Sequence, residues 1–244
     1  MNQVGELVPA ELGNSSLLLK RIRSGNAFEE TVERLLQTIR LGLAHPGDRL
    51  PGERDLATML DVSRDTIREA TSSLAEAGFL VIRRGRYGGT FVADKLPVEK
   101  ATTSAASQSE IQDVLTFREV VECGAAYAAA GAELSKEIRA ALWSAHQETS
   151  SAKPSDYRRL DSRLHLLIAE VTGSGKLVTE VAFSRMRVNE LLDQIPLLPP
   201  NIAHSNEQHE KIISAILQGN SIEAQSAMRD HLAGSAALLR GFLG

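Results

Sequence analysis

Apolar residues recur every three or four positions through most of the chain, a spacing that places them on one face of an α-helix. Gly, Pro, Ser and Asn residues separate these periodic stretches and mark turns. In the amino-terminal part the pattern predicts helices at 28–43, 53–60 and 63–77. In the carboxy-terminal part it predicts helices at 109–131, 135–150, 156–172, 176–195, 206–218 and 221–242.

Two short stretches depart from this helical spacing. Phe79 to Ile82 and Thr90 to Val92 flank the most glycine-dense segment of the chain, so they predict two strands joined by a turn. A Ser-, Thr- and Ala-rich segment without apolar periodicity follows, which is typical of a linker. The predicted organisation is an arm (1–26), a first domain (27–95), the linker (96–108) and an all-helical domain of six to seven helices (109–244).

The composition fits a mainly α, soluble protein. Hydrophobic residues make up 43% and charged residues 24% of the 244 residues, but aromatic residues only 4%, fewer than sheets use for cross-strand pairs. No apolar run approaches the ~18 residues that cross a bilayer, and the first residues lack a secretory pattern. We therefore expect a cytoplasmic protein with no membrane partner. The single cysteine, Cys123, excludes an intrachain disulfide and a cysteine zinc cluster.

The net charge of −4 is unevenly distributed along the chain. Residues 1–95 carry 13 basic and 13 acidic residues, whereas residues 96–244 carry 14 basic and 18 acidic ones. An overall acidic chain is unusual for a nucleic-acid binder. The first domain can still present a basic face, because phosphate groups respond to the local potential rather than to the net charge.

The second and third predicted helices have the spacing of a helix-turn-helix. Apolar residues share one side of the third helix, and Arg64 and Arg68 point together away from that side. Ser63 is placed to cap this helix, which puts Arg64 and Thr66 at the tip that would enter a major groove. Arginine there can bind phosphate or grip guanine.

The predicted hairpin carries Arg83, Arg84 and Arg86 beside its glycines. A glycine-rich tip can approach a sugar-phosphate backbone closely, so the hairpin would act as a wing at a minor groove. The alternative interpretation is a solvated pair of amphipathic helices next to a basic surface hairpin, with no nucleic-acid partner.

The segment from Leu50 to Val92 resembles the winged helix-turn-helix of GntR-type bacterial transcription regulators; it reads LPGERDLATMLDVSRDTIREATSSLAEAGFLVIRRGRYGGTFV. The resemblance implies that operator DNA is contacted by Arg54, Arg64, Thr66, Arg68, Arg84 and Gly85. Two features depart from the family pattern. Gly52 replaces the usual capping Ser, which costs a few tenths of a kcal/mol, and the wing is longer than the common Gly-x-Gly-Thr form.

Polar residues interrupt the apolar faces of the predicted helical domain, where they need partners. Asp161 and His165 are four residues apart on one face, a spacing that can present two ligands to one ion. His209 and His231 each lie on an otherwise apolar face. A lone histidine in such a place is more often a hydrogen-bonded core residue, but three histidines with an aspartate suit Zn, Ni, Mn or Fe.

Two other predicted helices carry polar residues on apolar faces. Arg118 shares a face with Glu122, and Arg185 and Asn189 interrupt an apolar stripe. An arginine near an ion would hold an organic carboxylate through paired donors. The alternative for Arg118 is an intrahelical ion pair with Glu122.

The helical part resembles the effector domain of the FadR subfamily of GntR regulators. The resemblance rests on Phe117-Arg118-x-x-x-Glu122 and on the runs LDSRLHLLIAEVTGS (160–174), NEQHEKIISAILQGN (206–220) and AMRDHL (227–232). It implies a divalent ion, with Zn preferred over Ni, Mn or Fe, whose ligands are Asp161, His165, His209 and His231. It also places Arg118 on the effector carboxylate. Arg185 and Asn189 are assigned to the effector from face geometry alone.

Together these observations predict a homodimeric transcription regulator, a repressor, that binds double-stranded operator DNA and senses a small carboxylate effector at the ion. One alternative keeps the DNA binding but senses an apolar effector, such as an acyl thioester, without a metal. A second is a metal-dependent hydrolase, but no general base, nucleophile motif or phosphate loop accompanies the ligands, so we do not expect an enzyme. A third is an architectural DNA binder with a silent helical domain.

Overall fold

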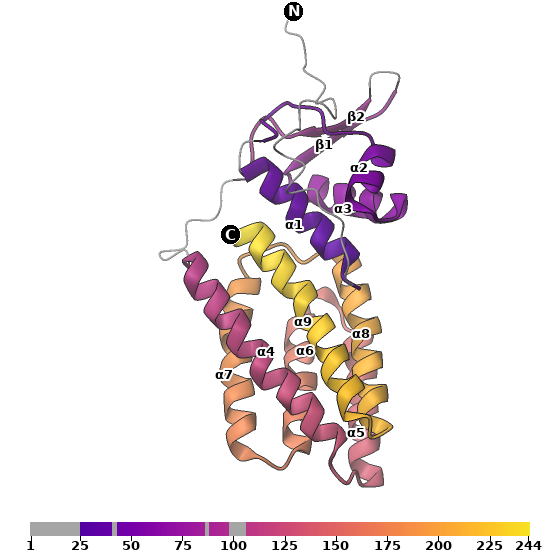
Figure 1. Cartoon of the computed structure of the whole chain (residues 1–244), viewed down its shortest axis with the longest axis vertical. Coiled ribbons are helices and arrows are strands. Elements are labelled where there is room, and N and C mark those ends of the chain that lie inside the picture. Colours follow the sequence, from indigo (N-terminus) through magenta and orange to yellow (C-terminus); the bar gives the residue numbers. More distant parts are fainter. Residues whose placement is uncertain (1–24, 41–42, 86–87, 98–105) are drawn as a thin grey trace, which may run out of the picture. The chain divides into compact units, whose positions relative to one another are not determined.

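The computed structural model describes residues 25–40, 43–85, 88–97 and 106–244, and over these ranges the chain is mostly helical with one small sheet (Figure 1). The predicted mainly α fold is confirmed. The described chain divides into two compact units, which we call the winged unit (residues up to 105, with 240–244) and the helical unit (106–239). Residues 1–24 of the expected arm, 98–105 of the expected linker, and Arg86 of the hairpin lie outside the described residues.

The winged unit contains three helices and a two-stranded sheet among its described residues: α1 (Ala27–Arg40), α2 (Glu53–Leu60), α3 (Arg64–Glu76), β1 (Leu80–Arg83) and β2 (Gly89–Val92). The strands are antiparallel, with Leu80 opposite Val92 and Arg83 opposite Gly89. Buried apolar side chains of the three helices, among them Leu36, Leu60 and Ile67, form the core. This packing fixes α3 on α1 and α2 and leaves its outer face in solvent.

A tight turn joins α2 to α3 and sets the angle between them. Asp61 ends α2 in the left-handed conformation, φ 58°, and its backbone N–H bonds to the carbonyl of Ala57. Ser63 then begins α3, because its hydroxyl accepts a hydrogen bond from the Thr66 N–H at 3.0 Å. The predicted cap is therefore present. Gly52, at the start of α2, offers no side-chain cap, as its lack of a side chain requires.

The helical unit is a bundle whose long helices run alongside one another (Figure 1). Its described helices are α4 (Gln108–Ala130), α5 (Lys136–Ser150), α6 (Pro154–Val171), α7 (Gly175–Leu192), α8 (Pro199–Leu217) and α9 (Ser221–Leu243). A capping box formed by Ser107 and Glu110 starts α4. In the described ranges, no helix combines the length and apolarity that a membrane span needs.

One helix boundary was predicted wrongly. The sequence pattern starts this helix at residue 206, but α8 begins at Pro199. Proline is tolerated in the first helical turn, where its missing N–H has no intrahelical partner to lose, so the Pro199-Pro200 pair starts the helix instead of interrupting it.

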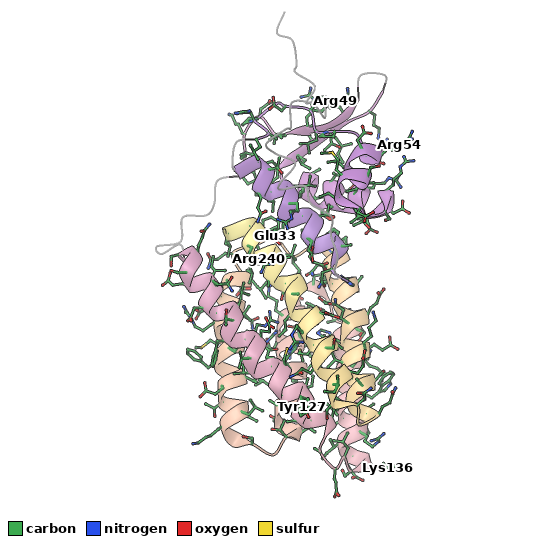
Figure 2. All side chains as sticks on the ribbon, in the orientation of Figure 1. Glu33, Arg49, Arg54, Tyr127, Lys136 and Arg240 are labelled. Atoms are coloured by element: carbon green, nitrogen blue, oxygen red, sulfur yellow. The ribbon has the colours of Figure 1, made fainter. Side chains whose placement is uncertain are left out.

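The last turn of α9 packs within the winged unit. Arg240 donates from Nε to Glu33 Oε1 at 3.0 Å and from Nη2 to Oε2 at 3.4 Å, and Figure 2 shows the two side chains together. The Phe242 ring meets Phe79 edge-on with centroids 5.7 Å apart. Gly241 lies so close to α1 that an added Cβ would sit 2.9 Å from the Cα of Glu33.

Gly241→Ala is therefore expected to destabilise the winged unit by about 1–3 kcal/mol, since the methyl group would overpack against backbone that cannot move aside freely. Urea unfolding, with amide hydrogen exchange of α1, would measure the loss. Gly124→Ala is the matched control, because nothing lies within 4 Å of a Cβ at that helical glycine, and alanine there should gain up to about 1 kcal/mol. Equal stabilisation by both substitutions would contradict the packing described.

Candidate metal centre and nucleic-acid interface

Four side chains from three helices converge inside the helical unit. Asp161 and His165 come from α6, His209 from α8 and His231 from α9. Each offers one ligand atom, these atoms all lie within 4.8 Å of one another, and all four residues are buried. The structure thus brings together the four residues that the sequence analysis selected.

The ligand atoms of this cluster face one centre. Nε2 of His209 lies 3.4 Å from Nε2 of His165 and 3.3 Å from Nε2 of His231. Oδ1 of Asp161 lies 3.2 Å from Nε2 of His209 and 3.8 Å from that of His165. Four ligands about 2.1 Å from a tetrahedral ion are about 3.4 Å apart, so the spacing fits a transition-metal ion.

Burial also favours the protonation state that a metal requires. It lowers the pKa of His165 and lowers that of His231 well below its ordinary value, so both rings are neutral and each can present a lone pair. Burial opposes ionisation of Asp161, but Arg185 and His209 hold the pKa of its carboxyl well below the usual range. A carboxylate and neutral imidazoles are the ligand forms of these groups.

Glu122 of α4 supports this cluster from outside. One of its oxygens, Oε2, contacts Nδ1 of His165, and the other accepts a hydrogen bond from Arg118 Nε at 3.0 Å. Although burial opposes ionisation, Arg118, His165 and Arg185 lower the pKa of Glu122 to about 2. The intrahelical pair that was the alternative for Arg118 is therefore present.

Two further ligands have partners of their own. Arg185 donates from Nη2 to Oδ2 of Asp161, which leaves Oδ1 facing the histidines. Nδ1 of His231 lies 3.3 Å from Oε1 of Gln208. Three of the four candidate ligands are thus held by a second side chain, as metal ligands commonly are.

The residues assigned to the effector lie at different distances from satisfaction. Arg118 is buried and also donates to Ser235 Oγ at 2.7 Å. Arg185 is buried too, but its Nε and Nη1 have no hydrogen-bond partner among the described residues. Asn189 donates to Ser162 Oγ at 2.9 Å, and its Oδ1 has no partner in the same part of the chain.

Sequence reasoning missed three residues of this site. It treated Glu122 only as a partner for Arg118, and it did not select Gln208 or Tyr157. Tyr157 is buried one helical turn before Asp161, and burial, with the charge of Asp161, raises the pKa of its hydroxyl, which stays protonated. The spacing of four residues between Tyr157 and Asp161 was the available signal.

In the winged unit, α2 and α3 present an arginine-bearing surface. Arg54, Arg64 and Arg68 are exposed, and Figure 2 shows Arg54 extending from α2. Arg68 bonds to Glu53 at 3.2 Å and to Asp65 at 3.0 Å, and Arg64 lies 3.9 Å from Glu53. These exposed ion pairs hold little energy, so a phosphate could displace them.

The described part of the hairpin places Arg84 and Gly85 in solvent. Gly85 has φ 104°, and its carbonyl accepts a hydrogen bond from the Gly88 N–H at 2.8 Å. Arg83 is different, because its guanidinium lies 4.4 Å above the Phe91 ring. Of the described hairpin arginines, Arg84 is the one that reaches outward.

Two family models match the chain. Residues 28–92 match "Bacterial regulatory proteins, gntR family", and residues 113–234 match the "FCD domain". The first range covers the winged unit, and the second contains all four residues of the buried cluster.

Curated relatives are similar to the chain over most of their length. The "Putative L-lactate dehydrogenase operon regulatory protein" of Escherichia coli (strain K12) is 30% identical over 216 residues, which cover 84% of this chain and 83% of that protein. The "HTH-type transcriptional regulator LutR" of Bacillus subtilis (strain 168) is 24% identical and covers 84% and 97%. Among solved structures, E. coli McbR/YncC shares the fold, with a TM-score of 0.51, 16% identity and coverage of 87% and 96%.

Proposed function

The chain belongs to the GntR family of bacterial regulatory proteins and carries an FCD domain, so it is a DNA-binding transcription regulator and not an enzyme; from this we propose that it is a cytoplasmic repressor that releases its operator when a small carboxylate binds at a divalent ion. The domain limits proposed for these two activities are 27–95 and 109–244.

The observation that carries the proposal is the convergence of Asp161, His165, His209 and His231. Three imidazoles and one carboxylate suit Zn, with Ni, Mn or Fe as alternatives, and leave positions open on a five- or six-coordinate ion. When bound, the ion would supply positive charge and open positions for an oxygen ligand. These ligands come from α6, α8 and α9, so an ion would also cross-link three helices.

The charges around the cluster favour an anionic effector. Arg118 and Arg185 balance Asp161 and Glu122, and the neutral rings add no charge. A divalent ion therefore gives this buried site a surplus of two positive charges, which a carboxylate ligand would reduce. Unpartnered donors of Arg185 support its assignment to the effector, and we keep Arg118 and Asn189 as further proposed contacts. One relative is named for an L-lactate dehydrogenase operon, and lactate is a small carboxylate.

We propose that Arg54, Arg64, Thr66, Arg68, Arg84 and Gly85 contact the operator. In a homodimer, two copies of α3 would enter major-groove half-sites about one helical turn apart. An effector can lower operator affinity only if it favours a dimer geometry that no longer matches this spacing. A coupling free energy of about 1–3 kcal/mol is enough for a measurable switch.

Native mass spectrometry of protein purified without chelators tests the proposal directly. We expect a dimer with one divalent ion per chain and a small organic acid bound. Operator binding should then weaken when the released acid is added back. A folded dimer without metal would favour an apolar effector instead, and unchanged operator affinity with every carboxylate tried would overturn the sensor role.

Arg68→Ala is expected to weaken operator binding about 10- to 100-fold, because it removes an exposed guanidinium from the groove-reading tip of α3. Fluorescence anisotropy with operator DNA at two salt concentrations measures the effect. Arg163→Ala, which removes an exposed arginine of α6, is the control and should leave affinity unchanged. Metal content should be the same in both variants. Unaltered binding by Arg68→Ala would remove this residue from the interface.

A further inference from the structure

Glu122 is buried to 1% exposure beside the ligand cluster, although it is not one of the four candidate ligands. An ionised carboxylate in such a place is costly unless its oxygens are bonded. Both oxygens are engaged, one with Arg118 Nε at 3.0 Å and the other with Nδ1 of His165. Arg118 is in turn fixed by Ser235 of α9 at 2.7 Å, so the carboxylate has little freedom to move.

The contact with His165 determines where that ring carries its proton. A neutral imidazole has one N–H, and an ionised carboxylate can only accept a hydrogen bond. The proton therefore resides on Nδ1, which donates it to Glu122, and Nε2 keeps a lone pair. That lone pair points to the centre, where Nε2 of His209 lies 3.4 Å away.

The other two histidines are held less firmly. His231 faces the neutral amide oxygen of Gln208 at 3.3 Å, and Nδ1 of His209 has no hydrogen-bond partner among the described residues. Only His165 is oriented by a full negative charge. A carboxylate on the far nitrogen fixes the tautomer of a ligand histidine and makes it a stronger donor.

We propose that Glu122 is a positioning residue of the metal centre. It accepts the Nδ1 proton of His165, holds the ring with Nε2 toward the ion, and is itself held by Arg118. The inference rests on the proposed function in one respect, since it assumes that the cluster binds an ion. It also makes a statement about the metal-free protein, because the tautomer of His165 is set without the ion.

Two measurements test this role. In the metal-free protein, nitrogen NMR of labelled histidines should show His165 protonated at Nδ1. In a chelator competition with zinc as the probe, Glu122→Gln should weaken binding about 10- to 100-fold. Glu33→Gln is the matched control, because Glu33 is also a buried carboxylate paired with an arginine but contacts no imidazole in the described chain; its zinc affinity should not change.

The outcomes separate the two proposals. If the native protein binds no zinc while His165 is protonated at Nδ1, the proposed metal function fails and the tautomer role of Glu122 stands. If zinc binds the native protein and Glu122→Gln equally well, or if His165 is protonated at Nε2, the positioning role is overturned. Should Glu122→Gln unfold because Arg118 loses its partner, Glu122→Asp retains the charge and withdraws the oxygen by one methylene, and it should still weaken zinc binding.

Discussion

Replacing Arg185 by methionine is expected to lower the free energy of unfolding of the metal-free protein by about 3–5 kcal/mol. Arg185 is 2% exposed, pairs with Asp161 and lies 4.0 Å from Glu122. Its removal leaves buried negative charge without a partner, and this is far more costly than the loss of a contact. Urea unfolding at pH 8 with a chelator present measures the change, because both carboxylates stay ionised at that pH in the unfolded chain.

Arg187→Met is the matched control, two residues away on the same helix. Arg187 is 43% exposed and pairs with the exposed Glu190, so its loss should change stability by less than about 1 kcal/mol. Zinc should restore part of the stability that Arg185→Met loses, since the ion's charge would replace the guanidinium. Equal stabilities for the two variants would contradict the buried charge network.

The sequence predicted those parts of the site that depend on local spacing. The separation of four residues between Asp161 and His165 places both on one face of any helix, and that face is buried. The Ser63 cap and the outward arginines of α3 follow from the same reasoning, because a cap and a helical face are properties of consecutive residues. The fold class was predictable for this reason as well.

Contacts between distant residues could not be predicted in this way. Glu122 meets His165 across 43 positions of the chain, and Arg185 meets Asp161 across 24. Periodicity shows that each residue lies on a buried face but not which neighbour it finds there. For Arg118 the sequence left an ion pair and an effector contact open, and the pair with Glu122 is the one observed.

His209→Ala is expected to weaken zinc binding by more than a hundredfold, because losing an outer partner of a ligand already costs about 10- to 100-fold and losing the ligand itself costs more. His209 is central to the cluster, since its Nε2 lies within 3.4 Å of the facing nitrogens of both other histidines. Its Nδ1 has no partner among the described residues, so the substitution breaks no other hydrogen bond of that ring nitrogen. The metal-free fold should therefore survive.

A thermal unfolding series with zinc would reveal the loss. Zinc at about a hundredfold excess over Kd should stabilise the native protein by about 2.7 kcal/mol, whereas the same concentration should leave His209→Ala nearly unchanged. His146→Ala is the control, because His146 is also buried but belongs to α5 and lies outside the four-residue cluster. It should keep the full zinc response. If His209→Ala kept that response too, His209 would not be a ligand, and the proposed link between the ion and the effector would lose its geometric basis.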